Sequence, residues 1–228
     1  MENKTTKTNT VADNLKMIEF CVKKLDSLAD GYKPLPKRMI GYGIMNDPIS
    51  TDDLYWDPIN KENAIDNRIA HFKGAVASLI EQKDSLTQTQ FYAIQNRTLD
   101  VAKHAIKTQR LADATQFIHL IASAELEGKT SPMKNRSAKV KELLLDTVDA
   151  YKEQYESLSG GMFSKQSSSD SSKQYGIKTT VEKLMDDIDA GKYGEELKGQ
   201  AKGSVYKEIE SKFFGFGGRY FVHDHDMF

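Results

Sequence analysis

The stretch that decides the fold class is VADNLKMIEFCVKKLDSLA, residues 11–29. Its apolar residues follow alternating steps of four and three positions, which places them in one stripe along an α-helix. Thr10 precedes the stretch and Asp13 follows three residues later, which is the spacing of a capping box with Asp in the Glu position. The sequence therefore predicts a helix that begins at residue 11 and ends before Gly31.

The same spacing of apolar residues recurs in residues 65–79, 87–127 and 137–158. In the longest of these stretches the apolar stripe loses register near residues 107–110, which predicts a kink or a break there. Convincing runs of alternating apolar and polar residues, the mark of β-strands, are lacking. We therefore expect an all-α fold in which residues 11–158 form an antiparallel helical bundle.

Composition divides the rest of the chain into three segments. Residues 1–10 are polar and are expected to form a disordered tail. Residues 159–178 contain a serine tract and are predicted to be a flexible Ser/Gly-rich linker. Residues 179–228 begin with another capping box, Thr179 with Glu182, and are predicted to form a small C-terminal helical module.

A long segment after the first helix is rich in proline and aspartate. Residues 32–60 hold four of the five prolines, so we expect a loop rather than a helix. An aromatic pair, Tyr55 and Trp56, follows the acidic pair Asp52 and Asp53. Exposed aromatics among charges are typical of a protein-binding hot spot. The alternative is that Trp56 closes the end of the helical core.

Overall composition restricts the partners and the compartment. The 32 basic and 33 acidic side chains give a net charge of -1, so the whole-molecule field does not favour nucleic acid or an anionic membrane. The single cysteine, Cys21, excludes an intramolecular disulfide and is expected to be a small buried apolar residue. No apolar stretch is long enough to span a bilayer, and we expect no secretory signal. These features favour a cytoplasmic location.

Two local clusters of basic residues depart from this near-neutral overall charge. The first is Lys103, Lys107 and Arg110, and the second is Lys129, Lys134, Arg136, Lys139 and Lys141. If the helices that carry them are antiparallel, the two clusters join into one anion-binding face for an anionic lipid, RNA or an acidic protein surface. The alternative is an ordinary solvated helix face.

The last residues of the chain hold the only candidate metal ligands that lie close together in sequence. His223 and His225 alternate with two aspartates, and in an extended segment both imidazoles share one face, where they can bind one zinc or iron ion. A third ligand would have to come from His71, His104 or His119. The alternative is that the terminal histidines are solvated and that the protein has no cofactor.

The C-terminal part of the chain, from Tyr175 to Tyr220, contains GKYGEELK at residues 191–198 between two short predicted helices, and then a Gly-rich aromatic finish. This arrangement of short helices, a glycine-containing turn and an aromatic end resembles the small helical modules at the C-termini of effectors secreted by intracellular bacteria. The resemblance implies a bacterial protein that is delivered into a host cell and acts through contacts with host proteins or lipids. The glutamates frequent in such signals have their nearest equivalents in Glu208 and Glu210.

Taken together, these patterns favour a non-enzymatic helical binding or scaffold protein whose main partner is another protein. Its predicted contact surfaces are the loop over residues 32–60 and the basic face. The alternative function is a metal-dependent hydrolase that uses His223 and His225.

Overall fold

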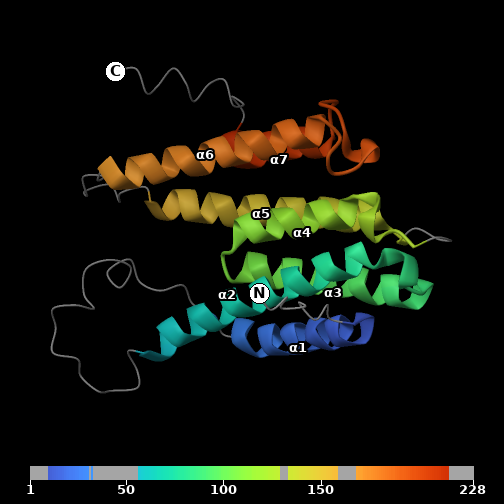
Figure 1. Cartoon of the computed structure of the whole chain (residues 1–228). Helices are drawn as coiled ribbons and strands as arrows, with labels where there is room; N and C mark the ends of the chain where they lie inside the picture. Colours follow the sequence, from blue (N-terminus) through green and yellow to red (C-terminus); the bar gives the residue numbers. More distant parts are fainter. Residues whose placement is uncertain (1–9, 31, 33–55, 129–132, 159–167, 216–228) are drawn as a thin grey trace, which may run out of the picture. The chain divides into compact units, whose positions relative to one another are not determined.

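The computed structural model of the chain is all-α, as the sequence predicts. It describes residues 10–30, 32, 56–128, 133–158 and 168–215, and these residues form helices without any β-strand. The α-helices are α1 (Val11–Ala29), α2 (Trp56–Glu81), α3 (Gln88–Lys107), α4 (Leu111–Ala122), α5 (Arg136–Leu158), α6 (Ser168–Asp189) and α7 (Val205–Phe214), shown in Figure 1. Short 3₁₀-helices follow three of them: η2 (Lys83–Ser85), η3 (Ala124–Leu126) and η4 (Glu195–Leu197).

The chain divides into two compact units. Unit 1 comprises Met1–Arg110 with Gly128–Thr130, and unit 2 comprises Leu111–Glu127 with Ser131–Phe228. The division differs from the predicted single bundle over residues 11–158. It lies where the apolar stripe of residues 87–127 loses register, because α3 packs against α1 whereas α4 packs against α5. The change of register therefore marks a change of core.

Helix α3 ends in a Schellman motif. The backbone N–H of Arg110 donates to the carbonyl oxygen of Ala105 at 2.7 Å, and the N–H of Gln109 donates to that of Ile106 at 3.0 Å. Gln109 has a φ of 63°, the left-handed conformation that glycine usually supplies in this motif. The predicted interruption near residues 107–110 is therefore confirmed, and it is a break.

In unit 1, α1 packs against both α2 and α3 (Figure 1). Helix α1 begins at the predicted capping box, in which the Thr10 hydroxyl accepts from the N–H of Asp13 and the Asp13 carboxylate accepts from the N–H of Thr10. Cys21 is buried, as predicted. The largest fully buried side chains of this core belong to the predicted stripes, and they are Ile18, Leu25, Ile65, Phe72, Leu79 and Ile94.

In unit 2, α5 lies between α4 on one side and the pair α6 and α7 on the other (Figure 1). Ion pairs join α5 to α7: Lys212 Nζ lies 2.6 Å from Asp149 Oδ2, and Lys141 Nζ lies 2.8 Å from Glu208 Oε2. Helix α4 has 12 residues and α5 has 23, so α4 covers only part of the length of α5. The apolar stripes meet inside the unit, at Val140, Leu144, Val148, Val181, Met185, Ile188, Val205 and Ile209.

Helix α6 begins within the serine tract, so it overlaps the predicted linker over residues 168–178. Thr179, the predicted first residue of a separate module, lies in the middle of α6 and donates its hydroxyl to the carbonyl oxygen of Tyr175 at 3.0 Å. The apolar residues at positions 181–188 are buried and the helix packs on α5. This burial stabilises a helix whose serine-rich first turns have low intrinsic propensity. The predicted linker residues 159–167 lie outside the described residues.

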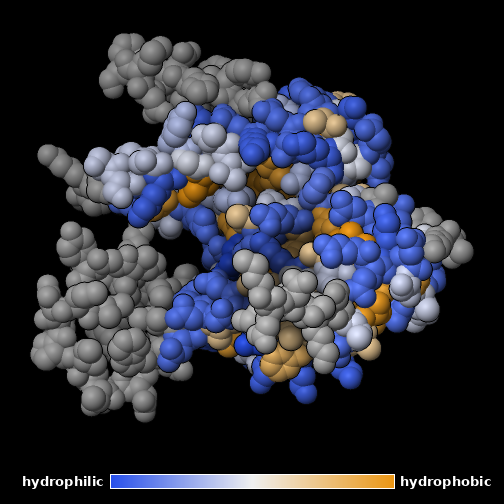
Figure 2. All heavy atoms as spheres, in the orientation of Figure 1, coloured by the Kyte–Doolittle hydropathy of each residue, from blue (hydrophilic) through white to orange (hydrophobic). Residues whose placement is uncertain are grey.

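Hydrophilic residues cover most of the helix surface that is visible in Figure 2. The large apolar side chains that are exposed in the described residues are Met17, Phe20 and Tyr175. Within these residues, no helix combines the length and the apolar character needed to cross a membrane.

Candidate functional site

A groove runs along unit 2 between α5 and α6. Its first half has a volume of about 530 Å³ and lies between the last turns of α5 and the first half of α6. Its second half, of about 360 Å³, is bounded by α4, α5, α6 and the turn after α6. Tyr151 of α5 and Thr180 of α6 line both halves. The two halves therefore adjoin at these residues, and together we call them the α5–α6 groove.

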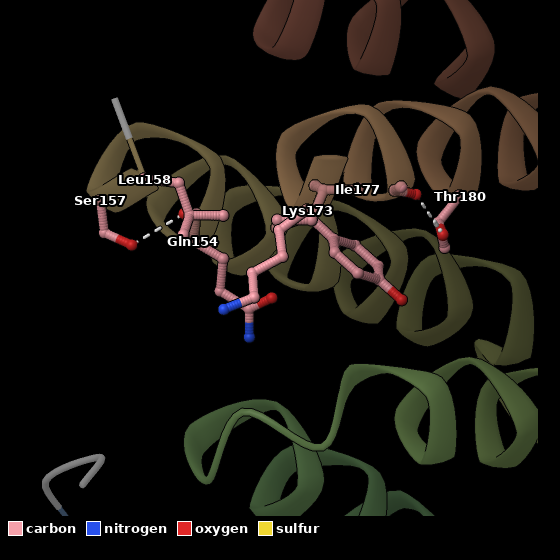
Figure 3. Close-up of a pocket in the computed structure, with 8 residues that line it drawn as sticks. Gln154, Ser157, Leu158, Lys173, Ile177 and Thr180 are labelled. Atoms are coloured by element: carbon pink, nitrogen blue, oxygen red, sulfur yellow. Dashed lines mark hydrogen bonds between the residues drawn. The ribbon is translucent and has the colours of Figure 1, made fainter. Parts of the chain in front are cut away.

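The first half has apolar walls and a polar rim. Figure 3 shows Gln154, Ser157 and Leu158 of α5 facing it, together with residues of α6. Its apolar lining residues include Leu158, Tyr151 and Ile177. This half is open because α4 is too short to lie beside the last turns of α5.

A glycine in the middle of α6, Gly176, lies beside open space in the groove. A Cβ atom added at Gly176 would meet no atom within 4 Å. The hydroxyl of Thr180 donates to the carbonyl oxygen of Gly176 at 2.8 Å, and that of Ser157 donates to the carbonyl oxygen of Gln154 at 2.7 Å (Figure 3). These hydroxyls are satisfied inside their own helices. The ammonium group of Lys173 is therefore the cation that this half offers to a ligand.

The turn after α6 closes the second half. Helix α6 ends in a Schellman motif, in which the N–H of Lys192 donates to the carbonyl oxygen of Asp187 and the N–H of Gly191 donates to that of Ile188, both at 3.0 Å. Gly191 has a φ of 81°, which side-chain-bearing residues rarely adopt. The turn brings Lys192 and the buried Tyr193 beside α4.

Contacts between the turn and α4 fix this wall of the groove. His119 Nδ1 lies 3.0 Å from the carbonyl oxygen of Lys192, and we assign the ring proton to Nδ1 because a carbonyl can only accept. The His119 and Tyr193 rings meet edge to face with centroids 5.8 Å apart. Lys192 Nζ lies 2.5 Å from Asp187 Oδ1. Among the described residues, Asp187 is the one carboxylate that lines the groove, and it is thus already paired with a lysine.

Two tyrosines of the groove stay neutral well above neutral pH. Burial raises the pKa of Tyr193, and the negative charge of Asp187 raises it further. Burial alone raises the pKa of Tyr151. Both phenols therefore remain hydrogen-bond donors at physiological pH. With the apolar walls, they give the groove the composition of a recognition surface.

Arg110, which was predicted to join a basic face, is hydrogen-bonded to other side chains of unit 1. Its guanidinium donates to Asp66 Oδ1 at 2.8 Å, to the carboxylate of Glu62 and to the hydroxyl of Tyr32 at 3.0 Å. Its side chain is only 13% exposed. Burial lowers the pKa of Arg110, but the hydrogen bonds to both carboxylates outweigh burial and raise it. Arg110 therefore holds α3 to α2 and is not free to bind an anion.

The other predicted basic residues lie in both units. Lys103 and Lys107 are exposed on α3 of unit 1. In unit 2, Lys134 is exposed, Lys139 is half-buried and Arg136 pairs with Glu127. The proposal of one joined anion-binding face thus loses Arg110 and Arg136 to internal ion pairs, and the exposed lysines remain.

The predicted loop site lies mainly outside the described residues, which include neither Asp52, Asp53 nor Tyr55. Trp56 is the first residue of α2, so the helix begins before the predicted end of the loop at residue 60. Whether Trp56 binds a partner or closes the core stays a prediction. The same holds for the zinc or iron site, because His223 and His225 also lie outside the described residues.

The three histidines considered as a further metal ligand lie in different settings. His71 is exposed on α2. His104 Nε2 lies 2.7 Å from Asp26 Oδ1 and so joins α3 to α1. His119 lines the α5–α6 groove.

The α5–α6 groove was missed in the sequence, although one signal pointed to it. Lys173, Ile177, Thr180, Lys183 and Asp187 recur every three or four residues, which places them on one helix face. The serine tract concealed this pattern because its composition favours a linker.

The run GKYGEELK, on which the resemblance to secreted effectors rests, forms the turn after α6 and the short helix η4. Comparison of the chain with models of protein families, with curated proteins and with solved structures found no match.

Proposed function

We propose that the chain is a non-enzymatic helical binding protein and that its partner, another protein, docks in the α5–α6 groove. The observation that carries this proposal is that residues along one face of α6 line both halves of the groove. From Lys173 to Asp187, residues of this helix line the groove without a gap of more than one turn. A surface of this kind accommodates a segment of polypeptide.

The dimensions of the groove support a peptide ligand. The lining residues from Lys173 to Asp187 extend over about 21 Å along the helix axis, at 1.5 Å per residue. That length equals about four turns of a bound helix. Small molecules are usually enclosed on most sides by their pockets, whereas the α5–α6 groove is open along its length.

The chemistry of the walls supports the same proposal. Tyrosine is enriched at protein interfaces because it combines a large apolar ring with a hydroxyl group that forms hydrogen bonds. Tyr151 lies at the middle of the groove, where both halves meet. A ligand side chain that reaches this point is surrounded by apolar atoms and meets a polar rim. This arrangement is typical of helix-in-groove recognition.

An unbiased selection tests this function. Random peptides displayed on phage are selected against the whole chain, and an enriched peptide is then titrated into isotopically labelled protein. We expect the largest amide shifts in the NMR spectrum at groove residues such as Tyr151, Thr180 and Lys183. Shifts confined to α1–α3 or to residues 33–60, or a selection that enriches nothing, would contradict the proposal.

A further inference from the structure

We infer that the partner segment of the α5–α6 groove is an acidic amphipathic helix. This inference rests on the proposed function and adds the chemical class of the ligand. It follows from the distribution of charge around the groove and from the spacing of its cations.

Lysines dominate the rim of the groove. Lys173 lines the first half, and Lys183 and Lys192 line the second. In the part of the chain that the structure describes, the one lining carboxylate is that of Asp187, and its Oδ1 lies 2.5 Å from Lys192 Nζ. The rim therefore carries an excess of positive charge, although the whole chain has a net charge of -1.

Two of these lysines are available to a ligand. Both Lys173 and Lys183 are exposed, and neither forms an ion pair or a hydrogen bond within the part of the chain that the structure describes. Other acidic side chains of α6, such as Glu182 and Asp186, do not line the groove. Helix α6 thus directs unpaired cations towards the groove and keeps most of its acids on other faces.

The spacing of the lysines fits a helical ligand. Lys173 and Lys183 lie about 15 Å apart along α6, at 1.5 Å per residue, which is about three turns. Between them lie the apolar surface of Ile177 and the open space beside Gly176. A ligand helix with an apolar stripe and carboxylates three turns apart matches both features. A polyanion such as RNA would leave the apolar walls in contact with charged phosphates.

Two synthetic probes test the inference. Each is a stapled helix of about 18 residues with leucine at positions i, i+3, i+4 and i+7, and the remaining positions are glutamate in one probe and lysine in its twin. We expect the glutamate helix to bind at least about tenfold more tightly, and its affinity to fall as salt is added. Equal affinity, or tighter binding of the lysine helix, would overturn the inference.

Replacing lysines by glutamates shows which lysines attract the glutamate helix. The double variant Lys173→Glu with Lys183→Glu should weaken binding of the glutamate helix by about tenfold. The matched control, Lys16→Glu with Lys23→Glu, makes the same change of net charge on exposed lysines of α1 in unit 1 and should change the affinity less than about twofold. Equal losses in both variants would show attraction by net charge alone and would overturn the inference.

The outcomes also separate this inference from the proposed function. If display-selected peptides shift groove residues but are basic or uncharged, and the glutamate helix does not bind, the groove is a binding site and the acidic class of ligand is wrong. If selected peptides map elsewhere, the proposed function itself fails.

Discussion

Units 1 and 2 are built from the same kind of amphipathic helix and both contain internal ion pairs, but Arg110 of unit 1 and two lysines of unit 2 lie in opposite settings. In unit 1, Arg110 turns inward and satisfies two carboxylates and a tyrosine hydroxyl. In unit 2, Lys173 and Lys183 remain unpaired within the described residues, beside an open apolar groove. A charged residue on a helix can therefore join one helix to another or stay available to a ligand. Its neighbours in space decide between the two roles.

The largest change in stability should come from removing the Arg110 guanidinium, which joins α3 to α2 in unit 1. Arg110→Met leaves the carboxylate of Glu62, whose side chain is 19% exposed, without its cation. We expect a loss of about 2 kcal/mol in the free energy of unfolding, measured by urea titration with circular dichroism. The control is Arg97→Met, because Arg97 also pairs with two carboxylates but is 38% exposed. Its loss should stay below about 1 kcal/mol, and equal losses would contradict an inward-directed role for Arg110.

A smaller effect on stability is expected from the buried phenol of Tyr193 in unit 2, and it depends on pH. Because the pKa of Tyr193 is raised in the folded chain, its contribution to stability is fully present below pH 10, the ordinary tyrosine pKa, and is lost as the pH rises towards the folded value. Tyr193→Phe should therefore reduce the alkaline loss of stability by up to about 1.4 kcal/mol per pH unit above pH 10. Urea titrations between neutral and alkaline pH measure this slope. An unchanged slope would show that Tyr193 titrates in the folded chain as it does in the unfolded one.

Much of the fold could be predicted from local patterns. The capping boxes at Thr10 and Thr87 mark the starts of α1 and α3, because capping depends on residues three positions apart. The loss of register near residues 107–110 likewise marks the end of α3. The start of α6 could not be predicted in this way. Its serine-rich turns are helical because later residues of the same helix are buried against α5.

The candidate site was much harder to predict, because distant segments of the chain build it. His119 of α4 and Tyr193 of the turn after α6 meet only once unit 2 has folded. Arg110 was misjudged for the same reason, since its partners Glu62 and Asp66 lie on another helix. Side-chain spacing within one helix shows which residues share a face, but it does not show what faces them.

Two mid-helix glycines allow the most direct test of the central claim, that the α5–α6 groove is the binding surface. Gly74 of α2 and Gly176 of α6 both have free space where a Cβ atom would lie, but only Gly176 lines the groove. Replacing either by leucine should raise the free energy of unfolding by up to about 1 kcal/mol, because leucine has the higher helix propensity. The decisive measurement is the affinity of a display-selected peptide for both variants. The account predicts a loss of at least about tenfold for Gly176→Leu and no loss for Gly74→Leu, and full affinity of a folded Gly176→Leu protein would contradict it.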